Sequence, residues 1–450
     1  MAMDEIQYQK MTETPVKRLI IKLSIPTIIS MLVTSIYNLA DTFFVSKLGE
    51  SASGAVSVVF SLMAIIQAIG FTLGMGAGSL ISAKLGEKKN DDAQKIGAMA
   101  FYSALTIGLL LTIFGLLFIN PLMKGLGSTE TVLPYAKAYA SYILYGAPIM
   151  AGSFVLNNIL RSEGKANLAM IGLVFGGLLN IALDPLFIFV FDLGISGAAI
   201  ATLISQVISF SILLACFLFK KTIVTLKLRY LTLNFLILLD IVKTGLPSLF
   251  RQGLASVSTI LLNKAAGTYG GDMALSAMGI VGKTFMIIFA VALGIGQGYQ
   301  PVCGYNYSSK HYKRVKEAFL FTFLSMTIVM TVLAFVFYFT APYVIKAFLN
   351  KEDVVKIGSM ALRYQCLAMP LLGVNVICNM TYQSTRKRFI ATLLSSLRQG
   401  LFLIPLLLIL PAIFKIQGVE LAQPLSDLLT CLFSIPFFVG FLKHLKKLDV

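Results

Sequence analysis

The sequence contains little charge and no tryptophan. Charged residues make up 13% of its 450 residues, against about a quarter in an average soluble protein, whereas 57% are hydrophobic. A soluble chain of this size has too little interior to hide so much apolar surface. Soluble enzymes and disordered chains are therefore excluded, and the composition indicates a polytopic membrane protein. Without tryptophan, the membrane–water interfaces must rely on tyrosine, lysine and arginine.

Side chains that catalyse reactions or hold metals are also scarce. The two histidines, His311 and His444, lie among basic residues outside the apolar stretches, so neither a histidine metal site nor a histidine catalytic dyad is available in the membrane. The five cysteines lie singly within apolar stretches and form no disulfide framework. The run Gly74–Gly78 lacks a following Gly-Lys-Ser/Thr, so we expect no nucleotide and no other cofactor.

The chain contains twelve apolar stretches long enough to cross a bilayer as helices, each needing about 20 residues. The predicted fold class is therefore an all-α polytopic membrane protein with twelve transmembrane helices. The stretches are 19–46, 55–83, 96–119, 133–159, 167–190, 196–219, 237–263, 273–303, 316–340, 354–383, 389–411 and 417–442.

Basic residues give the chain a formal net charge of +17, and most of them fall in alternate connections between these stretches. Lysine and arginine concentrate in cytoplasmic connections of membrane proteins. The pattern therefore predicts a multi-pass protein of the cytoplasmic (inner) membrane with both termini in the cytoplasm. The net positive charge is therefore accounted for by the membrane topology, and we expect no nucleic-acid partner.

The chain repeats itself at an offset of 220 to 222 residues. Pro26 matches Pro247, and Asn157 matches Asn379. Because six helices separate equivalent positions, the two halves have the same orientation in the membrane. We expect two pseudo-symmetric six-helix bundles: an N-terminal lobe at 1–219, a cytoplasmic linker at 220–236 and a C-terminal lobe at 237–450.

The first predicted helix carries a polar stripe that ends in a carboxylate. Thr34, Tyr37, Asn38 and Asp41 recur at three- and four-residue spacing, which places them on one face of a helix. Ionisable groups inside a membrane are costly and usually functional. The stripe points to a cavity, unless Asp41 sits at the outer water interface.

In the fifth predicted helix, Asn180 and Asp184 are one turn apart and Pro185 follows directly. Proline cannot donate to the carbonyl of Ile181, which frees an oxygen beside the carboxylate. A carboxylate, an amide and a free carbonyl suit Na⁺, and the same carboxylate can instead hold a proton. The alternative is that Asp184 caps the outer helix end.

Neighbouring helices add polar groups to the same lobe. The sixth offers Thr202 and Gln206 on one face, together with Ser205 and Ser209, and the fourth offers Asn157. Each alone is more typical of helix packing. Together with the two aspartates they indicate a wet, acidic pocket, with a coupling-cation site at Asp41, Asn180, Asp184 and Thr202 and cavity residues at Tyr37, Asn38, Asn157 and Gln206.

The second lobe lacks both acids and carries intramembrane bases instead. Its charge network comprises Arg251, Lys283, Arg398, Glu420 and Asp427. Buried opposite charges most often pair structurally, here Arg251 or Arg398 with Glu420 or Asp427. The alternative is that the bases contact substrate or hold a closed state. Lys283 has the least obvious partner.

These features resemble the MATE family, the multidrug and toxic compound extrusion transporters. The resemblance is carried by the repeated six-helix pattern, by Tyr37, Asn38 and Asp41, by the segment Leu179–Pro185, and by the Arg-x-x-Gly loop at Arg161–Gly164. It implies alternating access by two lobes that export amphipathic, usually cationic compounds in exchange for Na⁺ or H⁺.

The resemblance also implies roles for single residues. Asp41, Asn180, Asp184 and Thr202 correspond to a cation site, and Tyr37 and Asn157 are its neighbours. The second lobe departs from the family pattern, because residues 385–388 (Thr-Arg-Lys-Arg) replace a glycine-containing loop. Ion coupling by that lobe is therefore in doubt.

Two other functions fit parts of the pattern. A flippase for an anionic lipid-linked precursor would use Arg251, Lys283 and Arg398 to hold phosphate, although the aspartates favour cation traffic. An intramembrane transferase would need histidine, Asp-rich or metal-binding motifs that the chain lacks. The expected partners are a small amphipathic organic substrate and the lipid bilayer, with nothing in the sequence pointing to an oligomer.

Overall fold

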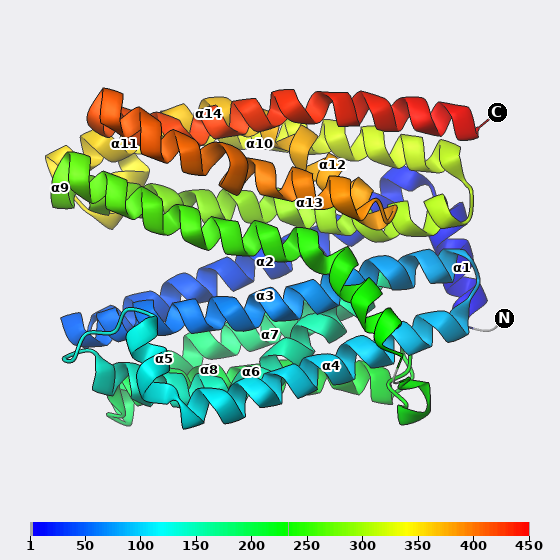
Figure 1. The fold of residues 1–450 in the computed structure, drawn as a ribbon, viewed down its shortest axis with the longest axis horizontal. Helices are drawn as coiled ribbons and strands as arrows, with labels where there is room; N and C mark the ends of the chain where they lie inside the picture. The colour runs from blue at the N-terminus through cyan, green and yellow to red at the C-terminus, as the bar shows by residue number, and fades with distance from the viewer. Residues whose placement is uncertain (1–2, 233, 450) are drawn as a thin grey trace. The chain divides into compact units, whose positions relative to one another are not determined.

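The computed structural model describes residues 3–232 and 234–449. Residues 1–2, 233 and 450, which belong to the predicted lobes and linker, lie outside the described residues. Most of the described residues are helical and none of them lies in a β-strand, as Figure 1 shows. This agrees with the predicted all-α fold.

The first half of the chain contains eight α-helices, one π-helical turn (η1) and one 3₁₀ turn (η2) among its described residues. They are α1 (Met3–Glu13), α2 (Val16–Ser46), α3 (Glu50–Gly86), α4 (Asn90–Leu117), α5 (Ile119–Gly125), α6 (Leu133–Ser162), α7 (Ala166–Pro185), η1 (Leu186–Val190), α8 (Gly194–Leu218) and η2 (Leu228–Tyr230).

The second half continues with longer elements, among them a 3₁₀ turn (η3) and a second π-helical turn (η4). They are α9 (Phe235–Ser308), α10 (Tyr312–Phe348), α11 (Glu352–Ala368), η3 (Met369–Leu371), α12 (Leu372–Ser384), α13 (Arg388–Ser396), η4 (Leu397–Phe402) and α14 (Leu403–Leu448).

The structure confirms the twelve predicted membrane helices. Ten continuous helical stretches of the described chain are long and apolar enough to cross a membrane. Two of them contain a sharp turn, at Gly271 in α9 (φ 64°) and at Lys415 in α14 (φ 53°), so each comprises two helices. Most helices extend a few residues beyond the predicted apolar stretches, because backbone hydrogen bonding continues outside the hydrocarbon layer.

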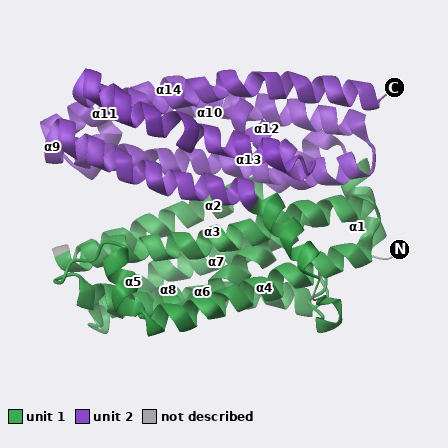
Figure 2. Ribbon diagram, viewed as in Figure 1, with its two compact units in different colours: residues 1–13, 25–245 green, residues 14–24, 246–450 purple. Residues whose placement is uncertain are grey.

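The helices form two compact units, shown in Figure 2. Unit 1 comprises Met1–Glu13 and Ile25–Gly245, and unit 2 comprises Thr14–Ser24 and Leu246–Val450. The beginning of α2 therefore packs within unit 2, and the beginning of α9 packs within unit 1. The division into functional lobes at 1–219 and 237–450, with a linker at 220–236, stays a prediction.

The internal repeat is visible in matching contacts. The Asn157 amide donates to the carbonyl of Ala169 over 3.0 Å, and the Asn379 amide donates to that of Ala391 over 2.7 Å. Both residues of the second bond lie 222 positions after those of the first. Each unit thus uses the same asparagine to fasten one membrane helix to the start of the next.

Close backbone contacts hold the beginning of α9 within unit 1 and the beginning of α2 within unit 2. Within unit 1, a methyl group on Gly245 would lie 1.9 Å from the Thr72 carbonyl oxygen, and one on Gly76 would lie 2.1 Å from that of Ile241. Within unit 2, a methyl group on Gly298 would lie 2.4 Å from Ser24 Oγ. Only glycine lets these helices approach so closely, since no Cβ atom tolerates such distances.

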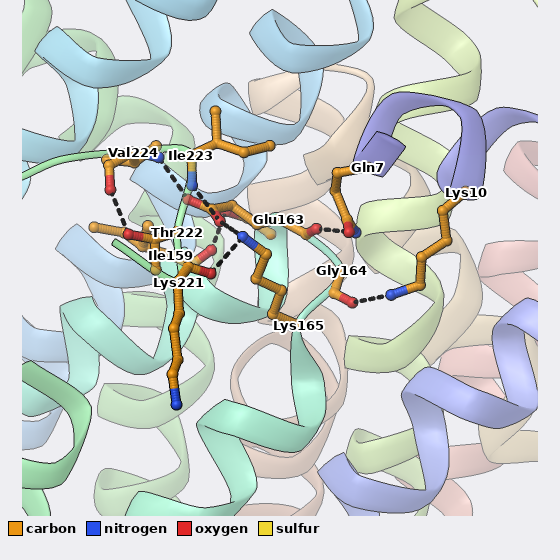
Figure 3. Close-up of polar contacts among 11 residues, drawn as sticks. Gln7, Lys10, Ile159, Glu163, Gly164, Lys165, Lys221, Thr222, Ile223 and Val224 are labelled. Carbon is orange, nitrogen blue, oxygen red and sulfur yellow. Dashed lines mark hydrogen bonds and ion pairs between the residues drawn. The ribbon is translucent and has the colours of Figure 1, made fainter. Parts of the chain in front are cut away.

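A buried carboxylate binds the segment that follows α8, as Figure 3 shows. The Glu163 side chain is fully buried and accepts hydrogen bonds from the amides of Ile223 (2.9 Å) and Val224 (2.8 Å). Lys165 forms an ion pair with it over 2.9 Å and donates to the carbonyl of Lys221. Burial raises the pKa of Glu163, against the opposing effects of Lys165 and the two amides. The start of the predicted linker is thereby held on unit 1.

Helix α1, which the sequence analysis did not predict, packs against the same loop (Figure 3). Gln7 donates to the carbonyl of Glu163, and Lys10 contacts that of Gly164. Gly164 has a φ of +75°, and a methyl group there would lie 2.5 Å from Met11 Sδ. The glycine of the Arg-x-x-Gly loop therefore serves both a left-handed turn and the docking of α1.

Replacing Gly245 by alanine tests this packing. We expect Gly245→Ala to lower the thermal unfolding midpoint, because overpacking a tight contact costs about 1–3 kcal/mol. The free, mostly buried cysteines allow unfolding to be followed with a thiol-reactive dye in detergent. Gly253→Ala is the matched control on the same helix, since nothing lies within 4 Å of its added methyl group. Equal midpoints for the two variants would contradict the close approach.

Candidate functional site: a buried carboxylate pair in unit 1

Helix α7 reaches its neighbours through glycines. A methyl group on Gly177 would lie 2.7 Å from Val33 Cγ1 of α2, and one on Gly176 would lie 2.7 Å from Ser209 Cβ of α8. The absence of side chains at these positions brings the helix backbones together. As a result, polar residues from α2, α7 and α8 converge within unit 1.

Asp41 lies at this convergence. It is 5% exposed, and its Oδ2 accepts a hydrogen bond from the hydroxyl of Tyr139 on α6 over 3.1 Å. Its other oxygen, Oδ1, is buried and has no hydrogen-bond partner among the described residues. Asp41 therefore lies inside the bundle, which disfavours the alternative of a position at the outer water interface.

Asp184 and Asn180 form the second part of the site. The Asn180 amide donates to Asp184 Oδ1 over 3.2 Å and to Thr202 Oγ1 over 3.3 Å. Asp184 is completely buried, and both its Oδ2 and Asn180 Oδ1 lack partners among the described groups. The α-helix gives way to the π-helical turn η1 directly after Pro185, where the missing amide proton interrupts regular hydrogen bonding.

Tyr139 connects the two parts. Its hydroxyl, which donates to Asp41, also lies near Thr202 and within electrostatic range of Asp184. The two aspartates also interact electrostatically with one another. We call Asp41, Tyr139, Asn180, Asp184 and Thr202 the carboxylate site.

Of the predicted cavity residues, Tyr37 and Gln206 border this site and two others do not join it. Tyr37 lies near Gln206 and within electrostatic range of Asp41. The Asn157 amide instead fastens α6 to Ala169, and the described structure gives the Asn38 side chain no hydrogen bond to the site. Tyr139 was missed, because a tyrosine in an apolar stretch carries no sequence signal of its own.

The chemistry of the site is that of an oxygen-lined receptor for a small cation. Three buried oxygens, on Asp41, Asn180 and Asp184, have no hydrogen-bond partner among the described residues, and such groups are costly to leave unpaired. No lysine or arginine forms an ion pair with either aspartate among the described residues. The same residues contain no group of three or more His, Cys, Asp or Glu that could hold a metal ion. Carboxylate, amide and hydroxyl oxygens fit Na⁺, and either carboxylate can take a proton.

The corresponding region of unit 2 is built differently. Leu262 or Asn263 stands at the repeat position of Asp41, and Leu262 packs with Leu403, Leu407 and Ala422 in an apolar cluster. Polar contacts lie instead around Asp427, which pairs with Arg398 through bonds of 2.6 Å and 3.3 Å. This pair is one of the structural pairings that the sequence allows.

Further contacts satisfy the Arg398–Asp427 pair. Asp427 accepts hydrogen bonds from Gln365 (2.7 Å) and Gln423 (3.0 Å). The guanidinium carbon lies 5.0 Å and 4.7 Å from the ring centres of Phe285 and Phe289. Arg398 therefore braces η4 against α9 and α14. Arg251, Lys283 and Glu420 form no ion pair among the described residues.

Ionisable groups buried inside a membrane-spanning helical bundle are typical of membrane transporters. A family model described as MatE matches residues 26–186 and 247–409, more than half of the chain. The chain belongs to the MATE family, whose members are transporters and not enzymes.

The chain is similar in sequence to named multidrug export proteins. The chain is 27% identical over 397 residues to the multidrug export protein MepA of Staphylococcus saprophyticus, covering 88% of this chain and 87% of that protein. It is 26% identical to a Staphylococcus aureus MepA over 431 residues, or 96% of this chain and 95% of that one.

Among solved structures, an outward-facing multidrug resistance MATE transporter of the MOP superfamily has a TM-score of 0.92 at 27% identity, with 97% of this chain and 98% of that one covered. A MOP superfamily transporter from Pyrococcus furiosus has a TM-score of 0.90 at 28% identity, with 98% of each chain covered. That protein is described as having a binding pocket of reverse polarity that suggests a different function.

Removing the Tyr139 hydroxyl tests the link within the carboxylate site. We expect Tyr139→Phe to reduce transport while the protein still folds, because Asp41 loses the donor that holds one of its oxygens. Transport rate and thermal midpoint should be measured together. Tyr142→Phe, on the same helix, serves as the control. Similar transport by both variants would show that the Tyr139 hydroxyl is dispensable.

The Arg398–Asp427 pair in unit 2 leads to a prediction about stability. Arg398→Ala leaves Asp427 buried without its cation, so we expect a loss of about 3–5 kcal/mol in the free energy of unfolding. Arg229→Ala, at an exposed arginine, should be nearly neutral. Adding Asp427→Leu to Arg398→Ala should recover part of the loss. An Arg398→Ala protein as stable as Arg229→Ala would refute the bracing role.

Proposed function

We propose that the protein is a secondary active multidrug efflux transporter. It exports amphipathic compounds, organic cations among them, across the cytoplasmic membrane in exchange for Na⁺ or H⁺. The observation that carries this proposal is the carboxylate site, with its unpartnered buried oxygens on Asp41, Asn180 and Asp184. The names of the MepA relatives, multidrug export proteins, support the substrate class.

The coupling ion occupies the carboxylate site in this proposal. Asp41, Asn180, Asp184 and Thr202 supply the oxygens for Na⁺, or the aspartates take protons. The ion drives alternating access if it binds one conformation more tightly than the other, and a difference of a few kcal/mol suffices. The apolar cluster at the matching place in unit 2 supports coupling through the first lobe alone.

The proposal also covers the lobes, the membrane topology and the oligomeric state. The lobes 1–219 and 237–450 alternate, joined by the linker 220–236, and both termini lie in the cytoplasm. The transporter acts as a monomer. A flippase is less well supported, because Arg398, one of the three bases assigned to a lipid phosphate, is already held by Asp427.

Transport in liposomes tests the proposal. A fluorescent lipophilic cation is followed while a Na⁺ gradient and a pH gradient are imposed one at a time. We expect one gradient to drive transport, and Asp184→Asn to abolish it while the protein remains folded. Asp192→Asn is the matched control, because Asp192 is exposed and its left-handed φ of 53° suits asparagine.

Two outcomes would contradict the proposal. Gradient-driven transport that survives in Asp184→Asn would remove the coupling role from the carboxylate site. Equal loss in Asp184→Asn and Asp192→Asn would mean that the assay reports a general sensitivity to lost acidic charge.

A further inference from the structure

Lys283 occupies an unusual place in unit 2. It lies in the second half of α9, twelve residues after the turn at Gly271 and 25 residues before the helix ends at Ser308. At 1.5 Å per residue, this is about 18 Å along the helix axis from the turn. Its side chain is nevertheless exposed and forms no ion pair within the described structure.

A lysine at this depth needs water or an anion. A charged side chain facing lipid is strongly disfavoured, so charged groups within membrane helices line watery passages or pair with other groups. The same face of α9 is open around Lys283: nothing lies within 4 Å of a methyl group built on Gly279 or Gly282. Ser276 is exposed nearby, and so is Thr259, which lies twelve residues before the turn. These features indicate a solvent-accessible face.

No described carboxylate of unit 2 forms an ion pair with Lys283. Asp427 is satisfied by Arg398, Gln365 and Gln423, and Glu420 forms no ion pair with Lys283. The positive charge is therefore available to a group from outside the protein. Exposed apolar side chains on the same helix half, Met273 and Met286, lie one to three turns away and suit the apolar part of an amphipathic molecule.

We propose that Lys283 binds an acidic group, a carboxylate or phosphonate, on the transported compound. The inference rests on the proposed function and refines its substrate class to amphipathic acids and zwitterions as well as simple cations. Lys283 is then a specificity-determining residue. The carboxylate site in unit 1 remains the place of the coupling ion.

A matched pair of probes tests the assignment. Transport of a fluoroquinolone with a free carboxylate is compared with transport of its ethyl ester in the same liposomes, for the wild type and for Lys283→Met, Lys283→Arg and Lys264→Met. We expect Lys283→Met to raise KM for the free acid at least about tenfold, the effect of losing one charged hydrogen bond, and to leave the ester unchanged. Lys283→Arg should retain most of the preference. Lys264→Met, at an exposed lysine elsewhere on α9, should behave as wild type.

The outcomes separate this inference from the proposed function. If Lys283→Met affects acid and ester equally, or affects neither, the inference is overturned. If Lys283→Met stops movement of a fluorescent phosphatidylglycerol across the bilayer but not transport of the free acid, the acidic group belongs to a lipid and the inference is also overturned. The Asp184→Asn variant is measured in parallel and tests coupling alone. If transport continues in Asp184→Asn, the proposed function is contradicted. The comparison of acid and ester still tests the role of Lys283 in that case.

Discussion

The central constraint is the burial of two carboxylates in a helix bundle where no described residue forms an ion pair with them. Asp41 and Asp184 lie within electrostatic range of one another, and each has one oxygen without a hydrogen-bond partner among the described residues. Such a pair is stable only if a proton or a small cation joins it, since two like charges in a poorly polarisable interior repel strongly. A site that requires a mobile positive charge is what an ion-coupled transporter needs.

The surrounding fold serves to assemble and confine that site. Glycines on α7 bring its backbone against α2 and α8, and Tyr139 from α6 donates a hydrogen bond to Asp41. The second unit repeats the framework, down to the hydrogen bond of Asn379 that copies that of Asn157, but fills the matching place with leucines. The two halves thus share an architecture but differ in charge. Among the described residues, unit 1 buries two aspartates that form no ion pair, and Lys283 of unit 2 forms none either.

Much of this was predictable from the sequence, because a bilayer imposes a length and a composition on every spanning helix. The twelve helices, the repeat and the acids Asp41 and Asp184 follow from apolar runs and from the cost of charge within them. Helices α1 and α5 were missed, since one is polar and the other spans seven residues. Tyr139 was missed because its role arises from packing between distant helices. The sequence could not choose the partner of Arg398 among several acids, which only the register of η4 against α14 decides.

The central claim, that the carboxylate site holds the coupling cation, is tested most directly by ligand-dependent stability. The thermal midpoint of the purified protein is measured as Na⁺ is added at constant pH and as pH is lowered without Na⁺. A bound cation stabilises the folded state by mass action, so the account predicts that the midpoint rises with Na⁺, with protons or with both. It also predicts that an Asp41→Asn, Asp184→Asn double variant loses this dependence and Asp192→Asn keeps it. An unchanged dependence in the double variant would place the cation elsewhere and contradict the account.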